Sequence, residues 1–163
     1  MLWRRALRPR GRIDRIGDRL CQELPMEISR QADYAVRAVL HLALHRSDLR
    51  VPSAEIAETQ NVPAAFLTKI LARLANAGIV DLKRGVHGGV SLAKPAGEFS
   101  LLEVVEAVDG PVTLNRCMAR PGECPRDAHC LVHPLWLEIR EEFRARLAGI
   151  SFSDLAGRAA ERA

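Results

Sequence analysis

The sequence has few aromatic residues and no long apolar run. Phe, Trp and Tyr make up 4% of the 163 residues although 48% are hydrophobic, so the core must be rich in Leu, Val and Ala. No stretch approaches the ~20 apolar residues that cross a bilayer, and the first 25 residues lack the apolar segment of a secretory signal. We therefore predict a cytoplasmic protein, in which thiols stay reduced and clustered cysteines are more often metal ligands than disulfides.

Positive charge is concentrated at the N-terminus. Residues 1–25 hold seven Arg and three acidic residues, which accounts for the whole net charge of +4. We interpret this segment as a disordered tail, or as a stretch upstream of a start at Met26 that is not translated, and a basic arm that contacts phosphates is the alternative. An argument for DNA binding must therefore rest on where charges lie in the rest of the chain.

The elements after Met26 have the order of a winged helix-turn-helix. Apolar residues at intervals of three and four predict a helix over 28–45, with Ser29 as its N-cap. A short helix over 53–60 and a longer one over 63–80 then form a helix-turn-helix outline. We expect Ser53 to cap the first of these, and the second to begin at Pro63, to stop near Gly78 and to present Phe66 and Leu67 on its apolar face.

Two short β-like runs follow the second helix. Ile79–Lys83 and Val90–Ala93 flank a glycine-rich turn, which predicts a β-hairpin in the position of a wing. The predicted fold class is thus mainly α with a small β-hairpin wing. We divide the chain into the tail 1–25, a DNA-binding domain 26–97 and a second unit 98–163.

Candidate DNA contacts lie on the second helix and the wing, because the helix enters a major groove and the wing lies over the neighbouring backbone. Each of these residues alone could simply face solvent. Asp81 is the only acidic residue between positions 60 and 94, however, so together they favour DNA. The predicted DNA-binding residues are Ser53, Ala64, Ala65, Thr68, Lys69, Arg73, Lys83, Arg84, His87 and Gly88.

The second unit contains a short and a long helix. Ser100 and Glu103 are spaced as the capping box of a helix over 99–110, and a last short helix over 151–156 has Ser153 as its expected cap. A helix over 134–150 carries an apolar stripe close to a heptad seam. The stripe could pack on its own domain, but we interpret it as a homodimer seam, which suits a palindromic DNA site. The predicted dimer residues are Trp136, Ile139, Phe143, Leu147 and Ile150.

Between these helices, Cys117, Cys124, Cys130 and His133 are spaced C-x6-C-x5-C-x2-H in a loop over 111–133. Buried free cysteines are a poor explanation, because the loop is rich in Arg, Pro, Asp and Gly. A structural zinc site of the Cys3His type and an iron–sulfur cluster both fit the ligand types. The residues alone leave these two alternatives open. No nucleophile motif or phosphate-binding loop accompanies the thiols, so we do not expect an enzyme.

From Met26 to about Ala156 the chain resembles the Rrf-two (Rrf2) family of bacterial winged-helix regulators. The matching segments include "ISRQADYAVRAVLHLA", "AEIAETQNVPAAFLTKILARLANAGIV", "KRGVHGGVSLAK", "LLEVVEAVDGPV" and "CLVHPLW". The resemblance implies a homodimer that binds double-stranded DNA. It also implies that Cys117, Cys124 and Cys130 hold an iron–sulfur cluster that senses iron–sulfur status, redox state or nitric oxide.

The family differs over the fourth ligand. IscR-like members use a histidine just beyond the last cysteine, matched by His133, whereas NsrR-like members use an aspartate from the partner's first helix, matched by Asp33. We favour His133 and a [2Fe-2S] cluster, with Asp33 and a [4Fe-4S] cluster as the alternative. The x6 spacing is x5 in IscR-like members, and Ala64, Ala65 and Thr68 differ from their pattern, so the DNA sequence is not carried over. A zinc-stabilised or thiol-sensing regulator without iron is the alternative function.

Overall fold

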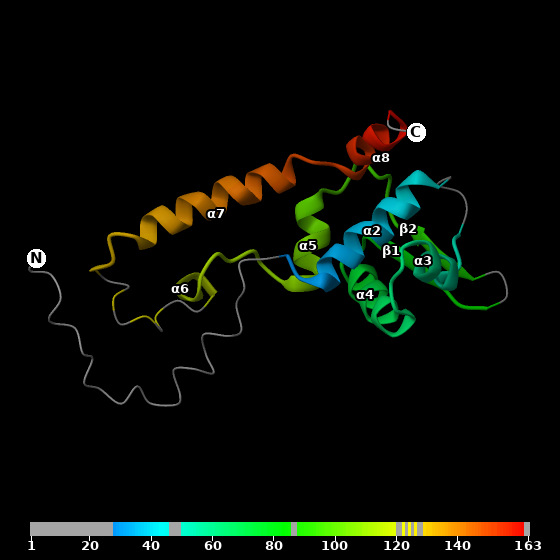
Figure 1. The fold of residues 1–163 in the computed structure, drawn as a ribbon, viewed down its shortest axis with the longest axis horizontal. Coiled ribbons are helices and arrows are strands. Elements are labelled where there is room, and N and C mark those ends of the chain that lie inside the picture. The colour runs from blue at the N-terminus through cyan, green and yellow to red at the C-terminus, as the bar shows by residue number, and fades with distance from the viewer. Residues whose placement is uncertain are drawn as a thin grey trace, which may run out of the picture.

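The computed structural model describes residues 28–45, 50–85, 88–119 and 129–161, together with residues 122, 124 and 126. The described chain is mainly helical with one two-stranded hairpin, which confirms the predicted fold class. We call residues 28–110 and 150–161 the head, and residues 111–149 the extension, from which one long helix projects (Figure 1). No helix of the described residues is both long and apolar enough to cross a membrane. The N-terminal tail lies outside the described residues.

Helix α2 (Arg30–Leu44) runs through the centre of the head. The Ser29 hydroxyl accepts a hydrogen bond from the Ala32 amide at 3.1 Å, which confirms the predicted N-cap. Small residues on the buried face, including Ala35 and Ala38, let neighbouring helices approach closely. Helices α4, α5 and α8 all pack against α2.

The helix-turn-helix consists of α3 (Ser53–Thr59) and α4 (Ala64–Asn76). The prediction that Ser53 caps α3 is wrong: Pro52 holds the N-cap position, without a side-chain hydrogen bond. Helix α4 buries an apolar stripe in the core, formed by Leu67, Ile70, Leu71 and Leu74. Phe66 does not share that face and is 48% exposed, because it lies one residue, or about 100° of helical rotation, away from Leu67.

The wing is an antiparallel hairpin of β1 (Val80–Lys83) and β2 (Gly89–Leu92), as predicted, with Val80 opposite Leu92. The structure adds a bridge that the sequence did not indicate. The Val51 and Val90 amides each donate to the other residue's carbonyl at 2.8 Å. A side chain at Gly89 would lie 2.8 Å from the Val51 carbonyl oxygen, and its φ of 153° also favours glycine. This close approach fixes the wing against the segment that leads into α3.

Helix α5 (Leu101–Asp109) begins with the predicted capping box of Ser100 and Glu103. The extension then contains the short helix α6 (Arg116–Ala119), which was not predicted, and the long helix α7 (His133–Ala148). Helix α8 (Phe152–Ala160) returns to the head. The prediction of Ser153 as its cap is wrong. Ser151 caps α8, because its hydroxyl accepts from the Asp154 amide at 3.1 Å while its own amide donates to the Asp154 carboxylate at 3.2 Å.

The head's core joins segments from both ends of the chain. Phe152 of α8 is fully buried, and its ring centroid lies 5.4 Å from that of Phe99. The returning chain is held by hydrogen bonds from the Leu101 amide to the Ile150 carbonyl at 2.8 Å and from the Ser153 amide to the Ala96 carbonyl at 3.2 Å. The core therefore does not divide at residue 97, where the sequence suggested a domain boundary.

Candidate nucleic-acid interface and cysteine loop

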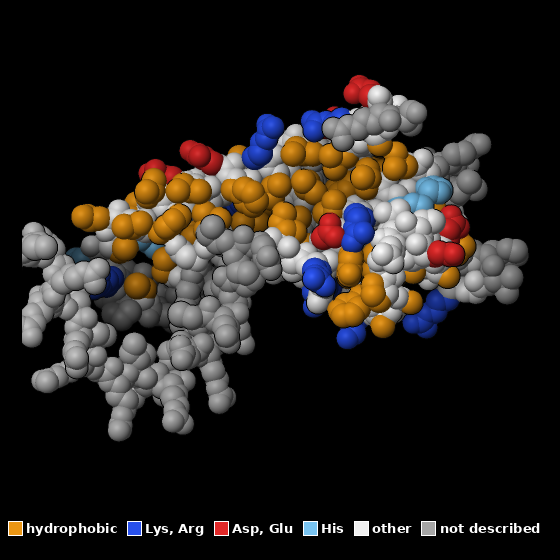
Figure 2. All heavy atoms as spheres, viewed as in Figure 1, with side chains coloured by type: hydrophobic (Ala, Val, Ile, Leu, Met, Phe, Trp, Pro, Cys, Tyr) orange, Lys and Arg blue, Asp and Glu red, His pale blue; other side chains and the backbone are white. Residues whose placement is uncertain are grey.

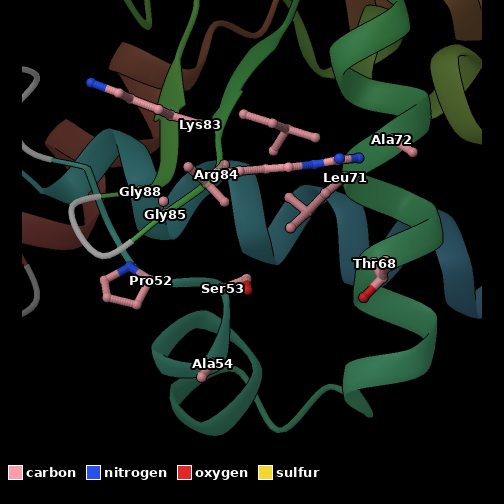
Figure 3. A pocket seen from close by; sticks show the side chains of 13 residues that line it. Pro52, Ser53, Ala54, Thr68, Leu71, Ala72, Lys83, Arg84, Gly85 and Gly88 are labelled. Atoms are coloured by element: carbon pink, nitrogen blue, oxygen red, sulfur yellow. The ribbon is translucent and has the colours of Figure 1, made fainter.

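A groove separates the wing from the helix-turn-helix. The start of α3, one face of α4 and the wing line it, with Ser53, Thr68, Lys83 and Arg84 among the lining residues. Figure 3 shows the Arg84 side chain extending from the wing across to α4. The structure thus brings predicted residues from three separate segments to one concave surface.

The exposed face of α4 borders this groove. Ala64, Ala65, Thr68 and Lys69 are all exposed. The Thr68 hydroxyl donates to the Ala64 carbonyl oxygen at 3.0 Å, which leaves its methyl group and the neighbouring alanines as a small, smooth surface. Such a surface lets a helix approach a nucleic acid or another partner closely.

Three exposed cations lie in the groove or on the face of α4 beside it. Lys69, Lys83 and Arg84 are exposed, and none forms an ion pair with any residue that the structure describes. A side chain at Gly88 would lie 2.3 Å from the Lys83 carbonyl oxygen, so the close turn of the wing requires glycine there. His87 lies outside the described residues.

Arg73 has a different environment from the other predicted DNA contacts. Its guanidinium donates to the Val108 carbonyl oxygen at 2.6 Å and to the Gln31 side-chain oxygen at 3.3 Å. Val108 lies in the last turn of α5, where unpaired carbonyl groups favour a cation. The structure therefore gives Arg73 an intramolecular role, which links α4 to α5.

The cysteine loop brings its first cysteine close to its final histidine. His133 Nδ1 lies 3.4 Å from Cys117 Sγ, although the residues are 16 positions apart, and Cys117 Sγ lies 2.9 Å from Asn115 Oδ1. The side chains of Cys117, Cys124 and Cys130 are half-buried. These types of donor fit an iron–sulfur cluster or zinc. Among the described residues, however, no three of these four donors all lie within 4.8 Å of one another.

Asp33, the alternative fourth ligand, lies on α2 in the head. Its carboxylate accepts a hydrogen bond from Arg37 at 2.8 Å, one helical turn away, and its side chain is 56% exposed. The Arg37 guanidinium also donates to the Gln60 carbonyl oxygen at 3.0 Å and lies over the Tyr34 ring. Within one chain the structure thus pairs Cys117 with His133, and Asp33 with Arg37.

The predicted seam of α7 is largely uncovered. Leu147 is buried, Trp136 and Ile150 are half-buried, and Ile139 and Phe143 are 38% and 39% exposed. Figure 2 shows hydrophobic side chains forming a continuous surface along α7 and onto α5. A helix with this much apolar surface exposed has room for a further partner.

Glu106 joins the extension to the head and was not identified from the sequence. Its carboxylate on α5 forms an ion pair with Arg144 of α7, and it accepts a hydrogen bond from the Val112 amide at 3.0 Å, at the start of the cysteine loop. Glu106 and Arg144 are 38 positions apart, so no local pattern could have connected them.

Known proteins resemble the chain over most of its length. Residues 28–158 match the Rrf2 family, described as "Iron-dependent Transcriptional regulator". Proteins named HTH-type transcriptional regulator IscR from Xenorhabdus nematophila and Photorhabdus laumondii are 36% and 37% identical over 130 residues, which cover 80% of this chain and 79% of each relative.

Solved structures agree with the fold. T. potens IscR superposes with a TM-score of 0.67 at 22% identity, covering 87% of this chain and 93% of that one. Staphylococcus aureus CymR has a TM-score of 0.61 at 26% identity, covering 78% and 96%. The relatives from Xenorhabdus nematophila and Photorhabdus laumondii are named as transcriptional regulators, which confirms the prediction that the chain is not an enzyme.

Proposed function

Because the chain belongs to the Rrf2 family of transcriptional regulators, we propose that it binds DNA as a homodimer and that an iron–sulfur cluster in the extension controls this binding. The main support is the position of the cysteine loop. It lies between α5, which contacts the recognition helix α4, and α7, the helix with the exposed apolar stripe. A change in the loop can therefore act on the DNA-binding surface and on the dimer seam.

The groove and the outer face of α4 are the proposed DNA surface. Ala64, Ala65 and Thr68 would allow α4 to enter a major groove, and Lys69 would contact phosphate or a base edge. Lys83 and Arg84 of the wing would bind the adjacent backbone. We omit Arg73 from this set because α5 already occupies its guanidinium.

Cys117, Cys124, Cys130 and His133 are the proposed cluster ligands. The short distance from Cys117 to His133 supports His133 as the fourth ligand and a [2Fe-2S] cluster, and the Arg37 ion pair of Asp33 weighs against the alternative. A bound cluster supplies a centre whose ligation responds to oxidation state and to nitric oxide. The chain itself supplies three thiolates and a ring nitrogen at the base of α7.

Contacts along α5 offer a route between the loop and the recognition helix. At one point Glu106 binds the start of the loop and α7; two residues later the Val108 carbonyl accepts from Arg73 of α4. A shift of α5 would therefore move the loop, the dimer helix and the recognition helix together. A cluster changes DNA affinity by this route only if it favours one position of α5 over another.

Anaerobic purification with visible absorption and metal analysis tests the cluster. We expect a coloured protein containing iron and sulfide, loss of the colour in Cys124→Ala, and a larger spectral change in His133→Ala than in Asp33→Ala. A colourless protein with stoichiometric zinc would refute the cluster and favour the regulator without iron.

DNA binding is tested by fluorescence anisotropy with a duplex that the protein selects from a random library. Lys69→Ala should weaken binding and, if Lys69 contacts phosphate, reduce the salt slope by about 1. Lys94→Ala removes an exposed lysine that lies beyond β2 and does not line the groove. This control should leave the DNA affinity and its salt slope unchanged. Equal effects of the two substitutions would contradict the proposed surface.

A further inference from the structure

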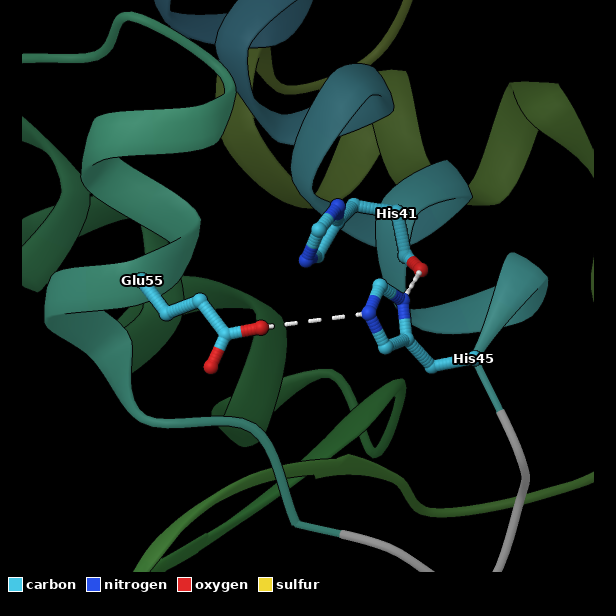
Figure 4. Close-up of side chains that lie close together, drawn as sticks. All are labelled: His41, His45 and Glu55. Atoms are coloured by element: carbon cyan, nitrogen blue, oxygen red, sulfur yellow. Dashed lines mark hydrogen bonds and ion pairs between the residues drawn. The ribbon is translucent and has the colours of Figure 1, made fainter.

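Two histidines and a glutamate converge where α2 ends and α3 begins, away from the cysteine loop. His41 lies in the last turn of α2, His45 is the C-cap residue of that helix, and Glu55 lies in the first turn of α3 (Figure 4). One donor atom from each lies within 4.8 Å of the other two. Among the described residues no other group of three possible metal ligands meets this condition.

The hydrogen bond of His45 fixes how its ring faces Glu55. Nδ1 of His45 lies 2.7 Å from the His41 carbonyl oxygen, and a carbonyl can only accept, so Nδ1 carries the hydrogen. In the neutral ring Nε2 is then a lone-pair acceptor, 3.9 Å from the Glu55 carboxylate. Two acceptors that face each other in this way can share a cation, which is either a proton on the ring or a metal ion between them.

His41 completes the cluster from the buried side. The residue is only 9% exposed, and its Nε2 has no hydrogen-bond partner among the residues that the structure describes. Figure 4 shows one nitrogen of this ring directed towards the space between His45 and Glu55. A buried nitrogen without a partner is costly, and a ligand that accepts its lone pair would remove that cost.

Gln60 can set the required form of His41. Its amide nitrogen Nε2 lies 3.2 Å from His41 Nδ1. A 180° flip of the amide, which exchanges its nitrogen and oxygen, would present the oxygen to the ring. Nδ1–H would then donate to that oxygen and Nε2 would keep its lone pair, as in the outer shell of many metal-binding histidines. Burial and the neighbouring His45 lower the pKa of His41, so the ring is neutral at pH 7.

We propose that His41, His45 and Glu55 bind one zinc-class divalent ion, with a fourth position open to water. Imidazole ligands favour zinc over calcium or magnesium, and two histidines with one glutamate are a known zinc ligand set. At zinc–ligand distances of 2.0–2.2 Å, tetrahedral donors lie roughly 3.4 Å apart, so donors that now lie within 4.8 Å of one another must close by about 1.4 Å at most. His45 and Glu55 are exposed side chains that can make this movement.

Such an ion would tie the end of α2 to the first turn of α3. Ser53 and Ala54, directly before Glu55, line the groove beside the wing. The ion would therefore hold one wall of that groove in place. This proposal is independent of the cluster, because none of its ligands lies in the extension.

Zinc titration of the full-length protein carrying Cys21→Ser, Cys117→Ser, Cys124→Ser and Cys130→Ser tests the site without competing thiols. In competition with a chromophoric chelator we expect one equivalent of zinc, and with cobalt visible d–d bands without a thiolate charge-transfer band. Glu55→Gln and His45→Ala should each weaken zinc binding by more than about 100-fold, and Gln60→Ala by about tenfold. Glu58→Gln, on the same helix and outside the cluster, is the matched control and should bind zinc normally.

Two results would overturn the site. One is the absence of zinc binding, or zinc binding that Glu55→Gln leaves unchanged. The other is that metal-free Glu55→Gln melts at a lower temperature than the protein with Glu55 intact, while zinc changes the melting temperature of neither. That result would identify His45 and Glu55 as an ion pair only. Neither result bears on iron content or on DNA binding by the protein with its cysteines intact.

Discussion

The head and the extension are built in opposite ways. In the head, α2, α4, α5 and α8 enclose a shared core with fully buried residues such as Val39, Leu74 and Phe152. In the extension only Met118 and Leu147 are buried among the described residues, while the stripe of α7 stays open. The head therefore obtains its stability from its own core, whereas the described residues of the extension bury little apolar surface of their own.

The largest effect on stability should come from the head's core. Leu74→Ala deletes a fully buried side chain of α4 and should lower the free energy of unfolding by about 2–5 kcal/mol. Urea unfolding followed by circular dichroism measures this loss. Phe66→Ala, at an exposed site on the same helix, should change it by only ~0.5 kcal/mol. Similar losses in the two variants would mean that α4 is not packed as described.

Next in size is the effect of a charge on the seam of α7. Phe143→Asp would bury a carboxylate in the proposed dimer and should raise the dimer dissociation constant roughly 100-fold, or about 3 kcal/mol. Analytical ultracentrifugation measures the shift from dimer to monomer. Ala145→Asp places the same charge on α7 outside the seam and serves as control. A dimer that survives Phe143→Asp would assign the stripe to some other partner.

A smaller effect is expected where the two regions communicate. Arg73→Ala removes the contact from α4 to the Val108 carbonyl. It should reduce the coupling free energy, which is the difference between the DNA-binding free energies with and without the cluster, by about 0.5–2 kcal/mol. Anisotropy titrations of both forms measure the ratio. Arg30→Ala is the control, because it removes an exposed arginine whose side chain makes no polar contact to the described residues. An equal fall in affinity of both forms of Arg73→Ala would instead indicate a direct DNA contact.

The smallest effect concerns the cap where the chain re-enters the head. Hydrogen bonds from Ser151 lower the pKa of Asp154 from its ordinary value of 3.8. The ionised carboxylate therefore stabilises the fold fully at a pH above 3.8, and this stabilisation is lost as the pH falls through the lowered pKa. Ser151→Ala should reduce the melting temperature by a few degrees at pH 7, and the difference should narrow in acid. Ser153→Ala should have less effect; the reverse order would restore Ser153 as the cap.

Elements with local signals were predictable from the sequence. The helix-turn-helix, the hairpin and the Ser100 capping box depend on residues a few positions apart, and the structure contains all of them. The Val51–Val90 bridge joins residues 39 positions apart and left no such signal. The error at α8 was avoidable, because Ser151 has Asp154 three residues later and Ser153 has no acidic residue at that spacing.

The candidate sites divide in the same way. The cysteine spacing and the basic wing could be predicted directly from the sequence. The hydrogen bond from Arg73 to the Val108 carbonyl of α5 could not, because the two residues are 35 positions apart. His41 and His45 are four residues apart, or about one helical turn, but they were not identified from the sequence. Glu55 belongs to another helix, so only the fold reveals the third ligand.

The return of α8 to the head makes the extension an insertion in the head. Because Phe152 belongs to the head's core, a growing chain cannot complete that core until the cysteine loop and α7 have left the ribosome. A truncated product ending before residue 152 would expose Phe99 and its neighbours and become a substrate for proteases. A head with a complete core therefore cannot form before the extension has been synthesised.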